Sequence, residues 1–185
     1  MYETSDFRNG LKIEIEGEPF VIVEFQHVKP GKGNAFTRTK IRSLLTGRVL
    51  DPTFKSGEKV GRPDIEEKSM QYLFKDGEHY TFMDQLSYEQ VMVDAKIVGD
   101  SEQWMSDNLA CQILFWNGKP IGVSVPAHVT LKIVECEPGV RGDTATNATK
   151  TAKLETGAVV QVPLFINEGE SIRVDTREAR YIERA

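Results

Sequence analysis

Short runs of alternating apolar and polar residues recur along the chain. One run covers residues 11–16, and after a Gly-Glu-Pro turn at 17–19 an extended apolar run covers residues 20–25. A period of two is typical of a half-buried β-strand, because successive side chains point to opposite faces. Similar runs, separated by turn sequences that include Asp-Gly and Asn-Gly, lie at 70–74, 79–83, 95–98 and 111–116. The pattern predicts an all-β protein.

A glycine-rich segment interrupts the strands early in the chain. Residues 29–34 contain one proline and two glycines, which predicts an exposed loop with Lys32 at its tip. The residues that follow alternate threonine or isoleucine with basic side chains, as in a strand. Arg38, Lys40 and Arg42 are spaced by two, so we expect them to share one face of that strand.

Helical signals are few and short. Residues 88–92 and 102–109 are each long enough for one or two helical turns, and Asp100 or Ser101 is a suitable N-cap for the second. Long periodic helices are not predicted anywhere.

Two turn-rich points divide the chain into segments of similar length. The first is Gly61-Arg62-Pro63 and the second is Val125-Pro126, after which a new alternating strand begins. The third segment also repeats the order found in the first, a Pro-Gly loop, Thr-rich basic sequence and then Thr-Gly. We therefore expect three small β-barrels at 1–63, 64–127 and 128–185, rather than one large sandwich.

Charge is distributed unevenly over these segments. The chain has 185 residues, 39% of them hydrophobic, and a net charge of −5. Residues 1–64 carry +2, residues 65–127 carry −6 and residues 128–185 carry −1. Between Glu24 and Asp51 there is no acidic residue but there are six Lys or Arg. An acidic protein with such a stretch is expected to bind nucleic acid through a local cationic surface and not through its overall charge.

The sequence also indicates a compartment. Cys111 and Cys136 are too few for a disulfide scaffold, and the N-terminus Met-Tyr-Glu-Thr-Ser-Asp does not look like a signal peptide. The longest apolar runs are far shorter than the roughly 20 residues that a membrane-spanning helix needs. A cytoplasmic protein without a membrane partner is expected.

No catalytic motif is evident. Gly31-Lys32-Gly33 lacks the frame of a phosphate-binding P-loop, and the three histidines are scattered without metal-ligand spacing. The prediction is a protein that is not an enzyme and needs no cofactor or metal. An enzyme using Lys32 as a Schiff-base nucleophile remains an alternative, but it would need an apolar pocket that lowers the lysine pKa.

Two motifs resemble one protein family. The run Lys29-Pro30-Gly31-Lys32-Gly33-Asn34-Ala35-Phe36, followed by Arg38, Lys40 and Arg42, resembles the hallmark loop of bacterial elongation factor P. The C-terminal signature of that family is similar at Lys150, Ala152, Gly157, Val160, Val162, Pro163, Ile166 and Gly169. The resemblance covers essentially the whole chain.

The resemblance implies a fold and a function. The fold is a KOW/SH3-like barrel followed by two OB-folds, arranged in an L-shape like that of a transfer RNA. The function is that of a translation elongation factor that binds the ribosome between the P and E sites and contacts the P-site tRNA. Such a factor stimulates peptide bond formation at consecutive prolines by positioning the tRNA. DNA is not an expected partner.

The resemblance also implies roles for individual residues. Lys32 corresponds to the lysine that carries a post-translational extension in many members, so a lysine-modifying enzyme is an expected partner. The chemical nature of that extension stays open. The residues expected to contact tRNA or rRNA are Lys29, Pro30, Gly31, Lys32, Gly33, Asn34, Arg38, Lys40, Arg42, Arg141, Lys150 and Lys153.

A generic OB-fold RNA-binding protein without a ribosomal site is the main alternative. Aromatic stacking platforms on the cationic strands would favour it, but Phe36 is the only aromatic residue of those stretches that the sequence offers. Trp104 and Trp116 are interpreted as core or turn-packing residues instead.

Overall fold

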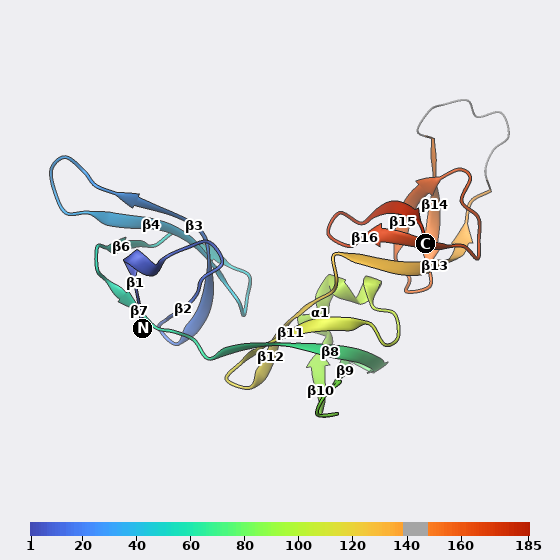
Figure 1. Cartoon of the computed structure of the whole chain (residues 1–185), viewed down its shortest axis with the longest axis horizontal. Coiled ribbons are helices and arrows are strands. Elements are labelled where there is room, and N and C mark those ends of the chain that lie inside the picture. The colour runs from blue at the N-terminus through green and yellow to red at the C-terminus, as the bar shows by residue number, and fades with distance from the viewer. Residues whose placement is uncertain (139–147) are drawn as a thin grey trace. The chain divides into compact units, whose positions relative to one another are not determined.

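The protein is built almost entirely from β-strands (Figure 1). The computed structural model describes residues 1–138 and 148–185. The chain forms two compact units, one of residues 1–67 with 114–122 and one of residues 68–113 with 123–185. No helix in the described ranges is both long and apolar enough to cross a membrane. The all-β prediction is confirmed.

The N-terminal barrel contains seven strands and one short 3₁₀ helix. Strands β2, β3, β4 and β5 form a sheet in that order, β6 pairs with β4, and β1 pairs with β7 (Figure 1). The bounds are β1 (Tyr2–Glu3), η1 (Thr4–Asp6), β2 (Lys12–Ile15), β3 (Glu18–Val28), β4 (Phe36–Ser43), β5 (Val49–Leu50), β6 (Thr53–Lys55) and β7 (Lys59–Val60).

Alternating inward side chains make the core of this barrel. Phe7 and Phe54 meet edge to face with ring centroids 5.3 Å apart. Around them are the buried residues Leu11, Ile13, Phe20, Ile22, Ile41 and Val60. Burying each of these side chains contributes roughly 1.5–3 kcal/mol, so this core stabilises the barrel from which the strands extend.

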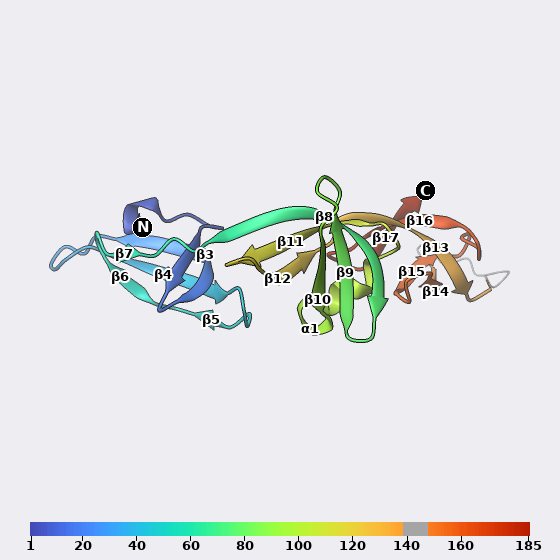
Figure 2. The same ribbon diagram turned by 90° about the horizontal axis from the view of Figure 1, so that it is seen from below.

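The central sheet has the strand order β10-β9-β8-β11-β12, and β9 lies between β8 and β10 in Figure 2. Its strands are β8 (Ile65–Asp76), β9 (His79–Asp84), β10 (Gln90–Asp94), β11 (Ala110–Trp116) and β12 (Lys119–Ser124). Asn117 and Gly118 both have positive φ, at 50° and 78°, as a type I′ turn requires. The predicted Asn-Gly hairpin is confirmed.

The predictions for the short helices need correction. Residues 88–92 do not form a helix, because Gln90 already begins β10. Residues 95–98 form the helix α1 (Ala95–Val98) and not a strand, since the Asp94 carboxylate accepts a hydrogen bond from the Lys96 backbone N–H at 2.9 Å and caps the turn. The helix predicted at 102–109 begins earlier, as η2 (Gly99–Trp104).

The C-terminal sheet has the order β15-β14-β13-β16-β17, and its outer strands β15 and β17 approach each other, so the sheet curls toward a barrel. Its strands are β13 (His128–Cys136), β14 (Thr149–Leu154), β15 (Val159–Pro163), β16 (Ser171–Asp175) and β17 (Arg180–Arg184).

The core of the C-terminal sheet includes a residue from the central segment. Trp104, at the end of η2, is 3% exposed and belongs to the same buried cluster as Leu131, Ile133 and Leu154. Nearby, the Thr156 hydroxyl donates a hydrogen bond to the Gln103 backbone carbonyl. The interpretation of Trp104 as a core residue is confirmed.

Candidate nucleic-acid interface

A long β-hairpin carries the predicted lysine loop. Strands β3 and β4 pair from Phe20 opposite Ser43 to Val28 opposite Phe36, and residues 29–35 connect their ends (Figure 1). Lys29, Lys32 and the other residues of 29–34 are all exposed. The predicted exposed loop is confirmed.

Glycines keep the loop thin. Gly33 has a φ of +103°, a backbone conformation that residues other than glycine rarely adopt. A Cβ at Gly31 would meet no atom within 4 Å, so the loop has no packing neighbour there. Within the described part of the chain, Lys29 and Lys32 have no carboxylate within ion-pair distance. The Lys32 ammonium is therefore free to reach a partner.

On strand β4 the uncharged polar side chains are buried and the charged side chains are exposed. Thr37, Thr39 and Ser43 are buried with Ile41, and the Thr39 hydroxyl donates to the Pro52 carbonyl at 2.7 Å. The alternate positions are exposed, and these hairpin cations are Arg38, Lys40 and Arg42. The expectation that they share one face is confirmed.

The surroundings of the hairpin cations are only weakly acidic. Lys40 lies 3.9 Å from the exposed Glu24 carboxylate, a separation and exposure at which an ion pair contributes about 1 kcal/mol or less. The Arg38 guanidinium lies over the Phe36 ring, 5.5 Å from its centroid, which fixes the direction of its donors. Most of the positive charge thus remains available to an anion.

Glu24 is a member of this surface that the sequence interpretation omitted. It lies opposite Lys40 in a register that is unbroken from Val28 to Glu24, and the bulge comes only beyond Glu24, before Ile22. Counting alternate positions of β3 back from the loop therefore reaches Glu24 on the face of the hairpin cations.

An open hollow of about 590 Å³ lies against the hairpin cations. Arg38 and Lys40 line it together with the two acids Glu24 and Asp51 and with Thr53. Its cations are suited to phosphate oxygens, and its carboxylates and hydroxyl are suited to sugar hydroxyls or base amino groups.

The expected contacts at the far end of the chain are placed differently. Arg141 lies outside the described residues. Lys153 is exposed on β14, whereas Lys150 is 4% exposed, because it alternates with Lys153 and shares the inward face of the strand with Ala152 and Leu154. Lys150 also lines a small open hollow with Glu137, Asn167 and Glu168, and its expected contact with RNA stays a prediction.

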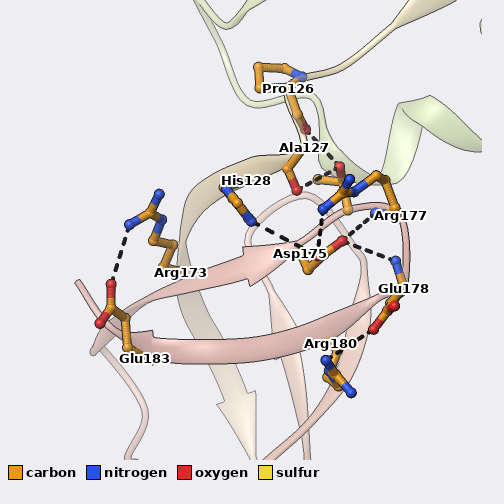
Figure 3. Close-up of polar contacts among 10 residues, drawn as sticks. Pro126, Ala127, His128, Arg173, Asp175, Arg177, Glu178, Arg180 and Glu183 are labelled. Carbon is orange, nitrogen blue, oxygen red and sulfur yellow. Dashed lines mark hydrogen bonds and ion pairs between the residues drawn. The ribbon is translucent and has the colours of Figure 1, made fainter.

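The arginines of β16 and β17 are already paired with acids (Figure 3). Arg173 lies 3.3 Å from Glu183, and Arg180 lies 3.0 Å from Glu178. Arg177 lies 3.3 Å from Asp175, and its hydrogen bond holds the pKa of the Asp175 carboxyl below its usual value. This hairpin neutralises its own cations, unlike the β3–β4 hairpin.

The chain matches three sequence models of one family. They are the elongation factor P (EF-P) KOW-like domain at residues 3–60, the EF-P OB domain at 65–123 and the elongation factor P C-terminal domain at 129–184. The chain belongs to the elongation factor P family. The family identifies it as a translation elongation factor whose work is associated with the ribosome.

Individual relatives agree over their full length. Elongation factor P of Nitratidesulfovibrio vulgaris (strain DP4) is 52% identical over 184 residues, with 100% of both chains covered. Elongation factor P of Maridesulfovibrio salexigens is 54% identical over 184 residues, covering 100% of this chain and 99% of the relative.

A solved structure shares the fold. The eukaryotic translation initiation factor 5A from Methanococcus jannaschii has a TM-score of 0.58 at 20% identity, covering 67% of this chain and 91% of its own. The expected combination of KOW-like and OB domains in an all-β protein is thus confirmed.

Proposed function

We propose that this elongation factor P family member binds the ribosome between the P and E sites, contacts the P-site tRNA and stimulates peptide bond formation at consecutive prolines. One observation carries the proposal. Lys32 is exposed, without an acidic partner among the described residues, at the end of a hairpin that is anchored in a rigid barrel. A cation held in that way suits insertion into a narrow RNA-lined site.

To stimulate this reaction, the protein needs only to position the acceptor end of the tRNA. Proline has a fixed φ and a secondary amine, so it is a poor nucleophile and is poorly placed as a peptidyl donor. Ordering the acceptor end of the tRNA lowers the entropic part of the barrier, which amounts to about 7–11 kcal/mol in ideal intramolecular reactions. No acid or base from the protein is required.

The cations fall into two proposed contacts. Lys29 and the hairpin cations neutralise phosphates of the acceptor arm, while the backbone of Pro30, Gly31, Gly33 and Asn34 follows the RNA closely. Lys153, together with Arg141 and Lys150, contacts RNA at the other end. The proposed domains are 1–63, 64–127 and 128–185, and the acidic central domain limits non-specific RNA binding in the cytoplasm.

The proposal is tested by Lys32→Ala in a reconstituted translation system with a polyproline reporter. The variant is expected to remain folded and to lose most of the stimulation. Arg48→Ala is the matched control, because Arg48 belongs to the same acid-free stretch but follows β4 at the end opposite the loop. Full stimulation by Lys32→Ala, or an equal loss in both variants, would overturn the proposed role of the loop.

The lysine-modifying enzyme is a separate part of the proposal. Intact-mass measurement of the protein purified from its own host, followed by peptide mapping across residues 27–38, is expected to show added mass on Lys32. A mass equal to that of the unmodified chain would show that no such enzyme acts on this protein.

A further inference from the structure

A second group of cations lies on the N-terminal barrel, outside the lysine loop and the hairpin cations. Arg8, Lys12 and Arg62 all line one open hollow of about 280 Å³, together with the ring of Tyr2. Glu67 is the one acid among its lining residues. We name these three cations the N-terminal cluster.

Backbone pairing between β2 and the residue after β7 brings Lys12 and Arg62 of the cluster close together. Glu14, on β2, and Gly61, just after β7, exchange two backbone hydrogen bonds of 2.9 and 3.0 Å. A Cβ at Gly61 would lie 3.1 Å from the Glu14 Cβ, tighter than most real Cβ contacts, so glycine suits this close approach. The pairing places Arg62 next to the strand that carries Lys12.

The position of Arg62 is defined further by an aromatic ring. Tyr2 pairs with Val60 across β1 and β7, and the Arg62 guanidinium lies 5.9 Å from the Tyr2 ring centroid. A guanidinium that lies over a ring face can still donate its N–H groups to an anion.

The cluster has little internal neutralisation. Among the described residues, none of Arg8, Lys12 and Arg62 has a carboxylate within 4.0 Å. Three cations against the single Glu67 leave a net positive hollow. Three like charges in one place repel each other, so an anion that enters the hollow is bound favourably.

The size of the hollow limits the ligand. Pockets that enclose a drug-sized molecule have about 300–1,000 Å³, and this hollow is slightly smaller and open to solvent. It suits one or two phosphate groups of a larger molecule better than a whole nucleotide.

The sheet register connects the cluster with the hairpin. Lys12 pairs with Val21, and Val21 pairs with Arg42, so Lys12 and Arg42 lie in one row on one face of the sheet. Arg42 on β4 and Lys12 on β2 therefore face the same side of the sheet, separated by the apolar Val21 of β3. A polynucleotide backbone, with phosphates at regular intervals, can place one phosphate at each of these separated cations.

The geometry points to a second phosphate-binding site at Arg8, Lys12 and Arg62, which takes the phosphodiester backbone of structured RNA. This inference rests on the proposed function in so far as the RNA belongs to the ribosomal complex. The same phosphate chemistry is present in P-site tRNA and in ribosomal RNA, and the experiment separates these two sources.

The test compares the full-length Arg8→Gln, Lys12→Gln, Arg62→Gln variant with the wild-type chain in binding to vacant ribosomes and to ribosomes carrying P-site tRNA. We expect about tenfold weaker binding, and a salt dependence of the association constant reduced by about 0.7–0.9 for each phosphate that the variant no longer neutralises. Weaker binding to both kinds of ribosome identifies ribosomal RNA as the source. Weaker binding only with tRNA present identifies the tRNA.

A matched control and a direct probe complete the design. Arg48→Gln, Lys55→Gln, Lys59→Gln removes the same charge from other parts of the barrel and is expected to weaken binding less. In addition, ¹⁵N-labelled wild-type protein is titrated with a short RNA hairpin, and the backbone amides of Gly10, Lys12 and Arg62 are expected to shift. Unshifted amides and binding equal to that of the control overturn the second site.

Failure of the proposed function gives a different result. If the chain does not use its hairpin on the ribosome, Arg38→Gln, Lys40→Gln, Arg42→Gln leaves ribosome binding unchanged, whereas the RNA hairpin still shifts the amides of the N-terminal cluster. If only the second site is wrong, the hairpin variant weakens ribosome binding and the cluster variant matches its control.

Discussion

The two cysteines lie in different surroundings. Cys111 is 1% exposed on β11, and burial raises the pKa of its thiol to about 11, whereas Cys136, at the end of β13, is partly exposed. The thiolate is the form that reacts with alkylating agents, so burial protects Cys111 in two ways, by blocking access and by keeping the proton.

Alkylation of the native protein is therefore expected to modify Cys136 and to spare Cys111. The measurement is mass spectrometry of peptides after maleimide treatment at pH 7.5, with the unfolded chain as the control in which both react. Equal labelling of the two thiols in the folded protein would contradict the burial argument.

The same thiol predicts how stability depends on pH. The folded protein holds the proton more tightly than the unfolded chain, so the free energy of unfolding is expected to fall as pH rises from about 9 toward 11. Two pKa units correspond to roughly 3 kcal/mol at most. Denaturant titrations of wild type and Cys111→Ala across this range are expected to show a flatter decline for the variant.

Single residues also show what a sequence reveals about exposure. The proline and glycines around Lys32 predict an exposed lysine, because they mark a loop, and loops lie at the protein surface. Lysine side chains are mostly exposed in proteins, yet Lys150 lies on the inward face of β14 with Ala152 and Leu154, as its spacing from these apolar residues indicates.

At the scale of elements, hairpin turns depend on backbone conformation. Gly118 has a φ of 78° and no atom within 4 Å of an added Cβ, so Gly118→Ala introduces backbone strain without a steric clash. The expected decrease in the free energy of unfolding is about 1 kcal/mol.

Gly122 supplies the matched control for this turn. It lies in β12 without a positive φ, and an added Cβ would be 3.6 Å from the Leu114 Cβ, an ordinary contact. Gly122→Ala is expected to be neutral or slightly stabilising, and thermal denaturation of both variants measures the difference. A larger decrease for Gly122→Ala than for Gly118→Ala would show that packing, and not φ, limits this hairpin.

Most strands could be predicted because alternation is a local signal. It identifies β2, β4 and β11 and the face on which the hairpin cations lie. It fails at 95–98, where an apolar run suggests a strand although Asp94 caps a helix. A run of four residues is too short for its period to distinguish the two structures.

The N-terminal cluster was not predictable in the same way. Arg8, Lys12 and Arg62 are scattered in sequence, and only the pairing of Gly61 with Glu14 brings them to one hollow. A local pattern of residues does not reveal which distant segments pair with each other. The cluster could therefore be recognised only from the structure.

At the scale of the molecule, Trp104 links the central segment to the C-terminal core. Trp104→Ala is expected to destabilise the unit of residues 68–113 and 123–185 by about 3–5 kcal/mol, the usual cost of removing a buried aromatic side chain. Thermal unfolding followed by NMR signals of β13 and β16 measures the effect.

Trp116→Ala is the control for Trp104→Ala, because Trp116 is only partly buried and lies outside the C-terminal core. It is expected to leave the signals of β13 and β16 unchanged. If Trp104→Ala spared these strands as well, the C-terminal core would not depend on the central segment.

The position of Trp104 also has a consequence for biosynthesis. The indole leaves the exit tunnel before any residue of the sheet that later surrounds it. The nascent chain therefore exposes a large apolar side chain that is not yet buried. The C-terminal sheet therefore folds around the Trp104 side chain, which is synthesised first. A chain released before that sheet is complete would leave the indole exposed and prone to aggregation.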